Sequence, residues 1–192
     1  GIDYLDQVKE LIIEYTKRLG RDLSFQNIDE ELGNPAKKYT EREKIEMNTK
    51  AYDKLNYTMA IVGAAADGKR HGCIVNSFAQ VTSSYPAKFV VSVNTEHDTC
   101  SAIEAAGSFA VTLLAKDCPK EIVNAFGYKS GRVGDKFAAY EAKEDAAGNP
   151  YLTEHMVARI SCKVVDKLAI GKYLLFVGDA TEAEILSDGQ VQ

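Results

Sequence analysis

The chain has 192 residues, a formal net charge of −5 at pH 7 and 45% hydrophobic residues. This length suits one globular domain with an appendage. The acidic balance, without a Lys/Arg cluster, excludes a nucleic-acid binder that tracks phosphates, and no apolar run approaches membrane-spanning length. Four scattered cysteines without a Cys-x-x-Cys pair favour reduced thiols in a cytoplasmic protein over a disulfide framework.

The three histidines, His71, His97 and His155, are isolated in the sequence. A metal site needs several ligands at workable spacing, so we expect none here. Each histidine is expected to be a surface or solvated side chain.

Residues 1–50 have a helical pattern. Apolar residues recur at three- and four-residue spacing from Ile2 to Leu19, which predicts an amphipathic helix. Thr40 and Glu43 form a capping box that predicts a further helix to about Leu55. The apolar stripe needs a surface to cover it, either on the rest of the chain or on a partner subunit. We therefore assign residues 1–50 to a helical N-terminal extension and residues 51–192 to a separate domain.

From Tyr57 the pattern changes to that of strands. Tyr57–Ala65 predicts a strand that ends in a turn at Asp67 and Gly68. Cys73–Thr82 and Phe89–Val93 predict two more strands. The first of these carries many short polar side chains, which are costly to bury unless something pairs with them. Either solvent or a polar, ring-shaped ligand meets this need.

A short helix is predicted after the strand at Phe89–Val93. It covers Cys100–Ala106, with Thr99 or Asp98 as its cap and Gly107 as its end. Phe109–Leu114 predicts a buried strand. Cys73 and Cys100 are expected to be small core residues.

The last third of the chain predicts further short elements. Pro119 begins a short helix, and Glu141–Asn149 is polar enough to be a solvated excursion. Val157–Val165 alternates as a half-exposed strand, with Arg159 and Ser161 on its polar side. Tyr173–Ile185 supplies one more long strand or a pair of strands. Strands at short spacing with small inserted helices predict a mainly β fold, a closed or partly closed antiparallel barrel.

The loop from Phe126 to Phe137 combines three glycines, three basic residues and three aromatic residues. This composition indicates a loop with binding potential. Phe126 and Tyr128 are either core residues or residues that stack on a ligand.

Three motifs lie in order along the chain. The first is the run Asn76–Ser83 with Pro86, Val91–Asn94 and Thr99. The second is Phe126-Gly127-x-x-Ser130-Gly131-Arg132-x-x-Asp135-Lys136-Phe137, and the third is Gly171 followed by Leu175–Asp179. Together they resemble the flavin reductase-like, FMN-binding split-barrel family, in particular its flavoredoxin and high-molecular-weight rubredoxin branch. The resemblance covers about Leu55 to Ile185, and residues 1–45 fall outside it.

This resemblance implies an antiparallel split β-barrel of Greek-key type and a homodimer that binds FMN at the subunit interface. The residues that would line the isoalloxazine ring and the ribityl chain, largely through backbone groups, are Asn76, Ser77, Gln80, Val81, Thr82 and Ser83. Asn94 and Thr99 would lie near the phosphate, and a helix start independently favours an anion there. Ser130, Gly131 and Lys136 would close over the ribityl–phosphate end, where Lys136 adds positive charge.

The resemblance also implies an activity. It is that of an FMN-dependent oxidoreductase that accepts hydride from NAD(P)H and passes electrons to flavin, iron or a small redox partner. No catalytic side chain is expected, because the flavin carries out the chemistry. Two alternatives are a flavoredoxin-like electron-transfer flavoprotein reduced by a protein partner and a non-catalytic binding module. Gly171 is followed by Lys172 and Tyr173, where many members have an Asp-His pair tied to nicotinamide binding, and this departure favours the first alternative.

Overall fold

The computed structural model describes residues 48–129, 131 and 134–192. The chain divides between Leu55 and Asn56 into two units, which are treated separately below. The described part of the first unit holds one 3-10 helix, η2 (Thr49–Lys54), whose cap Asn48 accepts a 3.1 Å bond from the backbone of Lys50. Of the α-helix predicted from Thr40 to about Leu55, the described part from residue 48 forms this short 3-10 helix instead, which buries none of its residues. The helices predicted before residue 48 lie outside the described residues.

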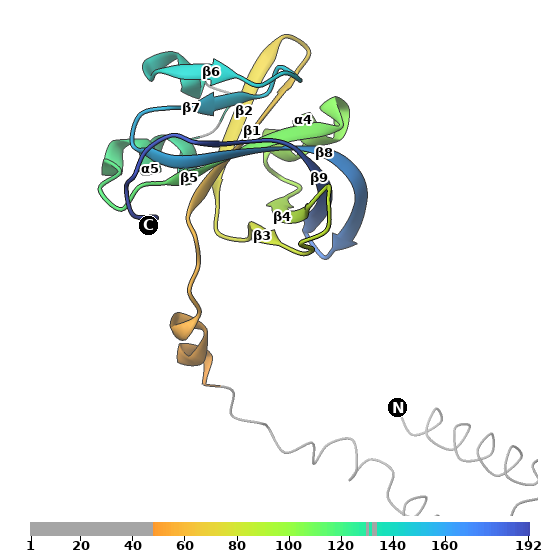
Figure 1. Ribbon diagram of the computed structural model, residues 1–192, viewed down its shortest axis with the longest axis vertical. Helices are drawn as coiled ribbons and strands as arrows, with labels where there is room; N and C mark the ends of the chain where they lie inside the picture. The colour runs from red at the N-terminus through yellow and green to blue at the C-terminus, as the bar shows by residue number, and fades with distance from the viewer. Residues whose placement is uncertain (1–47, 130, 132–133) are drawn as a thin grey trace, which may run out of the picture. The chain divides into compact units, whose positions relative to one another are not determined.

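A seven-stranded antiparallel sheet forms the second unit (Figure 1), in the order β2-β1-β5-β8-β9-β4-β3. Its strands are β1 (Ala60–Ala66), β2 (Lys69–Val75), β3 (Ala79–Gln80), β4 (Lys88–Asn94), β5 (Ser108–Leu114), β8 (Met156–Ile170) and β9 (Tyr173–Ile185). The sheet is strongly curved, but its ladder does not close, since β2 and β3 remain at its ends among the described residues. A mainly antiparallel β fold with short inserted helices is therefore confirmed, whereas a closed barrel is not formed.

The first predicted hairpin is present, but the strand after it was misread. Asp67 and Gly68 both have positive φ, 51° and 70°, as the tight β1–β2 turn requires. The single strand predicted over Cys73–Thr82 is wrong. Its first part belongs to β2, which pairs with β1, and its last part to β3, which pairs with β4. Because these partners lie at opposite ends of the sheet, the chain leaves the ladder between β2 and β3.

Hydrophobic side chains cover both faces of the sheet. The helices are α4 (Asp98–Ala106), α5 (Lys120–Gly127) and η4 (Lys136–Ala139). On one face Phe109 and Phe176 pack with Ile103 of α4. On the other, Ile61 packs with Phe126 of α5, and with η4 and β7. Each fully buried side chain of this size contributes roughly 1.5–3 kcal/mol, so the sheet is fixed from both sides.

A small hairpin, β6 (Ala142–Glu144) and β7 (Pro150–Leu152), forms at the predicted solvated excursion. Asp145 and Asn149 in its turn are buried. The Asp145 carboxylate accepts bonds from the backbone of Ala147 at 3.0 Å and of Asn149 at 2.8 Å, and the Asn149 amide donates to Ser108 at 3.0 Å. Most of residues 141–149 are exposed or partly exposed, as predicted, whereas Asp145 and Asn149 satisfy one another and so tolerate burial.

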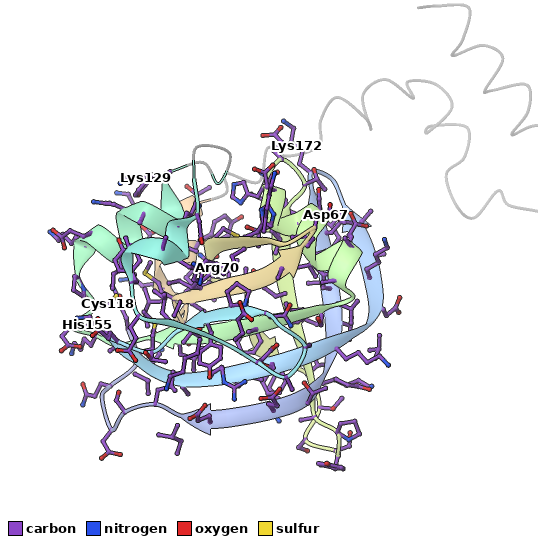
Figure 2. The ribbon with its side chains drawn as sticks, turned by 90° about the horizontal axis from the view of Figure 1, so that it is seen from above. Asp67, Arg70, Cys118, Lys129, His155 and Lys172 are labelled. Atoms are coloured by element: carbon purple, nitrogen blue, oxygen red, sulfur yellow. The ribbon has the colours of Figure 1, made fainter. Side chains whose placement is uncertain are left out.

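The β8–β9 hairpin is the longest feature of the sheet. Figure 2 shows His155, just before β8, and Lys172, in the β8–β9 turn, at its two ends. Leu168, Ile170 and Tyr173 near the turn are 58%, 52% and 47% exposed. Leu168 and Ile170 are two residues apart and Ile170 pairs with Tyr173, so the three share one face, called the apolar strip below. Within the described ranges, no helix has the length and apolar character needed to cross a membrane.

Candidate functional site

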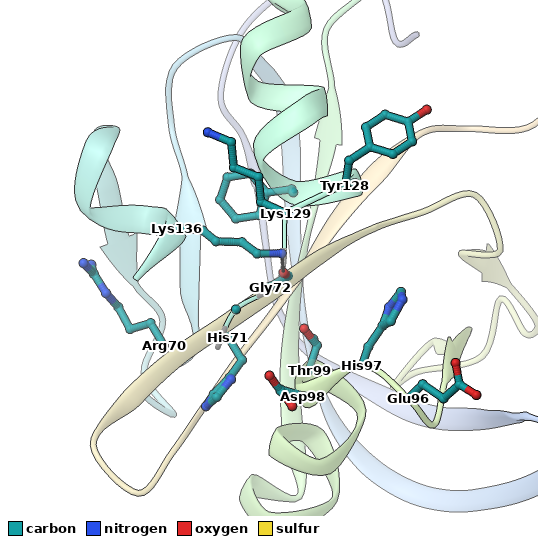
Figure 3. A pocket seen from close by; sticks show the side chains of 13 residues that line it. Arg70, His71, Gly72, Glu96, His97, Asp98, Thr99, Tyr128, Lys129 and Lys136 are labelled. Atoms are coloured by element: carbon teal, nitrogen blue, oxygen red, sulfur yellow. Dashed lines mark hydrogen bonds between the residues drawn. The ribbon is translucent and has the colours of Figure 1, made fainter. Parts of the chain in front are cut away.

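Two adjoining pockets open beside the break between β2 and β3. The larger, about 550 Å³, lies between β2, the start of α4 and the segment after α5 (Figure 3). Its charged and polar side chains include Arg70, His71, Glu96, Asp98, Lys129 and Lys136. The smaller, about 390 Å³, is lined by neutral polar residues of the β2 end and β4, together with Tyr173. His97 lines both pockets, so they adjoin at this residue.

Lys136 reaches into the larger pocket from the first turn of η4. Its Nζ atom donates a hydrogen bond to the carbonyl oxygen of Gly72 at 3.0 Å, the dashed contact in Figure 3. The same atom lies 5.8 Å from the ring centre of Phe126. Burial lowers the pKa of Lys136, although the nearby Cys73 and Asp98 oppose the shift. The pocket therefore presents a partly desolvated cation.

Gly72, whose carbonyl accepts this bond, lies where a side chain would collide with two aromatic rings. A Cβ atom there would lie 2.7 Å from Phe137 and 3.1 Å from Phe126. These two rings pack edge to face with centres 4.9 Å apart. A glycine inside a strand often marks such a close approach, and here it lets the rings pack against β2 directly.

The start of α4 forms another wall of the larger pocket. His97 is the cap residue and makes no side-chain capping bond, so the prediction of Thr99 or Asp98 as the cap is wrong. Thr99 lies in the first turn and is buried. Burial raises the pKa of Cys73 to about 11, so this thiol is neutral near pH 7. The helix start adds partial positive charge to the wall.

Asn76, Ser77 and Asn94 from the first motif line the smaller pocket. The Ser77 hydroxyl donates to the carbonyl of Ser92 at 2.9 Å and accepts from the backbone N–H of Ser92 at 3.1 Å. The Asn94 side chain accepts from the backbone of Glu96 at 2.9 Å. The side chains of Ser77 and Asn94 thus hold the walls of this pocket in place.

Gln80, Val81, Thr82 and Ser83 lie on β3 and the turn to β4, outside the lining of both pockets. Gln80 donates to the carbonyl of Thr82 at 2.9 Å, and the Thr82 hydroxyl accepts from the backbone of Lys88 at 3.1 Å. Their side chains stabilise the turn, and ligand contact by these residues stays a prediction.

Some residues of the second motif line the larger pocket, and others do not. Gly131 and Lys136 line the larger pocket, whereas Ser130 lies outside the described residues. Phe126 is a core residue that also borders the pocket. Tyr128 is 84% exposed, and in Figure 3 its ring points away from the Lys136–Gly72 contact.

Five pocket residues did not emerge from the sequence: Arg70, His71, Glu96, His97 and Lys129. His71 is partly exposed, as expected for a surface side chain, although its Nδ1 atom is buried and has no hydrogen-bond partner within the described ranges. Two signals pointed to this region. Gly72 interrupts a strand pattern next to His71, and Lys129 belongs to the basic, glycine-rich loop.

Comparisons with known proteins agree on one family. The model of the flavin reductase like domain matches residues 52–192. The ferric-chelate reductase (NAD(P)H) of Archaeoglobus fulgidus is 37% identical over 145 residues, which cover 76% of this chain and 85% of that protein. The high molecular weight rubredoxin of Moorella thermoacetica is 33% identical over 75% of this chain, and the match spans only 62% of its length.

A solved structure gives the same result for the fold. The flavoredoxin of Methanosarcina acetivorans matches with a TM-score of 0.63 and 24% identity, over 74% of this chain and 75% of that one. At this identity the likeness concerns the fold alone.

Proposed function

The chain belongs to the flavin reductase like domain family, and on that premise we propose that it is an FMN-dependent oxidoreductase. In this proposal it takes reducing equivalents from NAD(P)H and passes them to flavin, iron or a small redox partner. When bound, FMN supplies the redox chemistry by accepting a hydride on its ring and returning electrons to an acceptor. The chain's own residues bind the cofactor and orient it.

The observation that carries the proposal is the contrast between the two adjoining pockets. The larger offers Lys129, Lys136 and a helix start without a side-chain cap, which suit an anionic group. The smaller offers neutral polar groups and the ring of Tyr173. FMN combines an anionic phosphate with a planar polar ring, so the residues present fit it.

Each predicted binding residue has a part in this arrangement. Lys136, Thr99 and Gly131 hold the phosphate end, with Ser130 in the same loop. Asn76 and Ser77 face the ring and the ribityl chain, and Asn94 joins them in place of its expected position near the phosphate, because it lines the smaller pocket. The turn that carries Gln80, Val81, Thr82 and Ser83 forms the rim beyond them. No acid or base side chain is required.

We further propose that the chain is a homodimer whose residues 51–192 form the split-barrel domain. Tyr173 belongs to the apolar strip and also lines the smaller pocket. A second copy that covers the strip therefore also borders the ring end of the flavin site. This relation supports a cofactor site at the subunit interface.

A visible spectrum tests the proposal. Protein reconstituted with FMN is expected to absorb near ~450 nm and to bleach rapidly when NADH or NADPH is added without oxygen. Protein that remains colourless and binds no added FMN overturns the proposal.

A specific observation favours one other function, electron transfer from a protein donor. Lys172 occupies the β8–β9 turn, and its Nζ atom lies 3.0 Å from the Glu96 carboxylate, while its carbonyl accepts from Thr95 at 2.9 Å. This turn thus offers a paired lysine where many relatives have Asp-His. Stopped-flow mixing separates the two functions: a flavin that binds but is not bleached by either nicotinamide nucleotide supports the electron-transfer protein.

A further inference from the structure

The segment Asp135–Phe137 is attached to β2 at two residues that share one face of the strand, Arg70 and Gly72. The Asp135 carboxylate accepts from Nε and Nη2 of Arg70 at 2.9 and 2.5 Å. Its other oxygen accepts from the backbone of Phe137 at 2.9 Å and so caps η4. The Arg70 guanidinium also lies 5.8 Å from the centre of the Phe137 ring.

Lys136 lies between these two anchored residues. A lysine side chain is flexible, so the place of its ammonium group depends on how firmly its backbone is held. In Figure 3 the Arg70 side chain points away from Thr99 and His97, and its guanidinium is committed to Asp135. The Arg70 and Asp135 side chains are 29% and 38% exposed, so their attraction alone adds little stability. Their value to the site is geometric.

We propose that the Arg70–Asp135 ion pair is a positioning device that holds the Lys136 ammonium at the wall of the larger pocket. It thereby sets the preference of the site for a phosphorylated flavin over an unphosphorylated one. The inference rests on the proposed binding of FMN. Arg70 and Asp135 are positioning residues, and contact with the phosphate belongs to Lys136.

The position of the Lys136 ammonium group matters because charge interactions weaken with distance and with the entry of water. Doubling the separation of two unit charges halves their Coulomb attraction, and water that enters the gap weakens it further. Loss of the ion pair frees Lys136 to move toward solvent. The contribution of the phosphate to binding then falls, while the contribution of the ring does not.

The test measures dissociation constants for FMN and riboflavin, which differ by the phosphate alone, by fluorescence titration of the full chain. Wild type is expected to prefer FMN. Asp135→Asn keeps the cap oxygen but removes the charge, and Arg70→Gln removes the guanidinium. Each is expected to reduce the preference for FMN by about five- to tenfold through weaker charge attraction and to leave riboflavin binding unchanged. In a Lys136→Gln background neither change is expected to have a further effect, since residues that act as one unit are not additive.

Glu104→Gln is the matched control, because it breaks another partly exposed ion pair, with Lys167 at 2.5 Å. It is expected to leave the preference intact. An equal effect of Arg70→Gln with and without Lys136 overturns the inference in favour of direct phosphate contact by Arg70. An unchanged preference in both variants, a parallel loss of riboflavin binding, or a wild type that binds both flavins equally also overturns it. A wild type that binds neither flavin overturns the proposed function, and this inference with it.

Discussion

The ammonium group of Lys136 donates to the carbonyl oxygen of Gly72 at 3.0 Å and so connects the loop after α5 with strand β2. Position 72 suits a residue without a side chain, since the rings of Phe126 and Phe137 occupy the space that a Cβ atom would need. The ammonium group of Lys136 and the aromatic pair Phe126–Phe137 therefore meet the backbone of β2 at the same residue.

The charge of Lys136 leads to a pH-dependent affinity. Burial lowers its pKa below the ordinary value of 10.5, so its positive charge is complete at neutral pH and is lost as the pH rises through the lowered pKa. We expect the dissociation constant for FMN to increase as the pH rises through this lowered pKa, below the range where an ordinary lysine loses its proton. Isothermal titration at a series of pH values measures this increase.

Two comparisons test whether the lost charge of Lys136 causes the increase in the FMN dissociation constant. Riboflavin lacks the phosphate, so its affinity is expected to stay constant over the same range. The arginine of a Lys136→Arg variant keeps its charge at high pH, so the affinity of this variant for FMN is expected not to change with pH. Asp98 and Cys73 face the same ammonium group, and burial raises the pKa of Cys73 to about 11, so this thiol stays neutral while Lys136 titrates below it. An equal pH dependence for FMN and riboflavin contradicts the assignment to Lys136.

Gly72→Ala is expected to destabilise the fold. The added Cβ would lie 2.7 Å from the ring of Phe137, so the aromatic pair or β2 must shift. Overpacking of this kind costs about 1–3 kcal/mol in the free energy of unfolding, which urea denaturation measures. Gly134→Ala is the control, because no atom lies within 4 Å of its Cβ position and its φ is not positive. Equal stability of the two variants excludes the steric account.

The features that local patterns determine could be predicted from the sequence. The family match over residues 52–192 confirms the resemblance drawn from the motifs, and β9 has the predicted bounds. The run Cys73–Thr82 was misread because strand propensity is local, whereas the separate pairing of β2 and β3 is decided by distant strands. Asp145 was expected in solvent because its partnership with Asn149 leads to Ser108, 41 residues away from Asn149. Long-range contacts of this kind leave no periodic signal.

Arg159 illustrates the same limit and gives another prediction. Alternation along β8 assigned it to an exposed face, but its side chain is 7% exposed. Its guanidinium donates to Glu182 at 2.9 Å and to Glu184 at 3.2 Å, and it lies 4.6 Å from the ring centre of Tyr151. Arg159→Met removes these charged hydrogen bonds but leaves carboxylates that solvent reaches, and we expect a loss of about 1.5–3 kcal/mol of stability in thermal and urea unfolding.

The two glutamates provide an internal comparison. Glu184 is 50% exposed, so Glu184→Gln is expected to cost less than about 1 kcal/mol. Glu182 is 31% exposed and also accepts from the backbone of Ala146 at 2.9 Å, in the turn of the β6–β7 hairpin. Glu182→Gln is therefore expected to cost more than Glu184→Gln. A loss for Glu184→Gln as large as that for Arg159→Met would show that exposure does not govern this cluster.

The apolar strip gives the last prediction, on assembly. Leu168, Ile170 and Tyr173 expose about half of their surface on one face of the β8–β9 hairpin. If a second copy covers this face in an interface of ordinary size, about 1,200 Å² or more, a charge placed at its centre is desolvated without a partner. Leu168→Glu is therefore expected to convert a dimer into a monomer in sedimentation experiments. Its FMN affinity is expected to fall as well, because Tyr173 belongs both to the strip and to the smaller pocket.

Ala183→Glu is the matched control for this change. Ala183 is an exposed apolar residue of β9 outside the strip, and the substitution adds the same charge. It is expected to leave both the dimer and the FMN affinity intact. A wild type that sediments as a monomer at micromolar concentration, or a Leu168→Glu variant that remains a dimer, contradicts the assignment of the strip to the interface. A monomeric variant that binds FMN as tightly as wild type would instead show that FMN binding does not require the dimer. The ring end of the smaller pocket would then need no second copy.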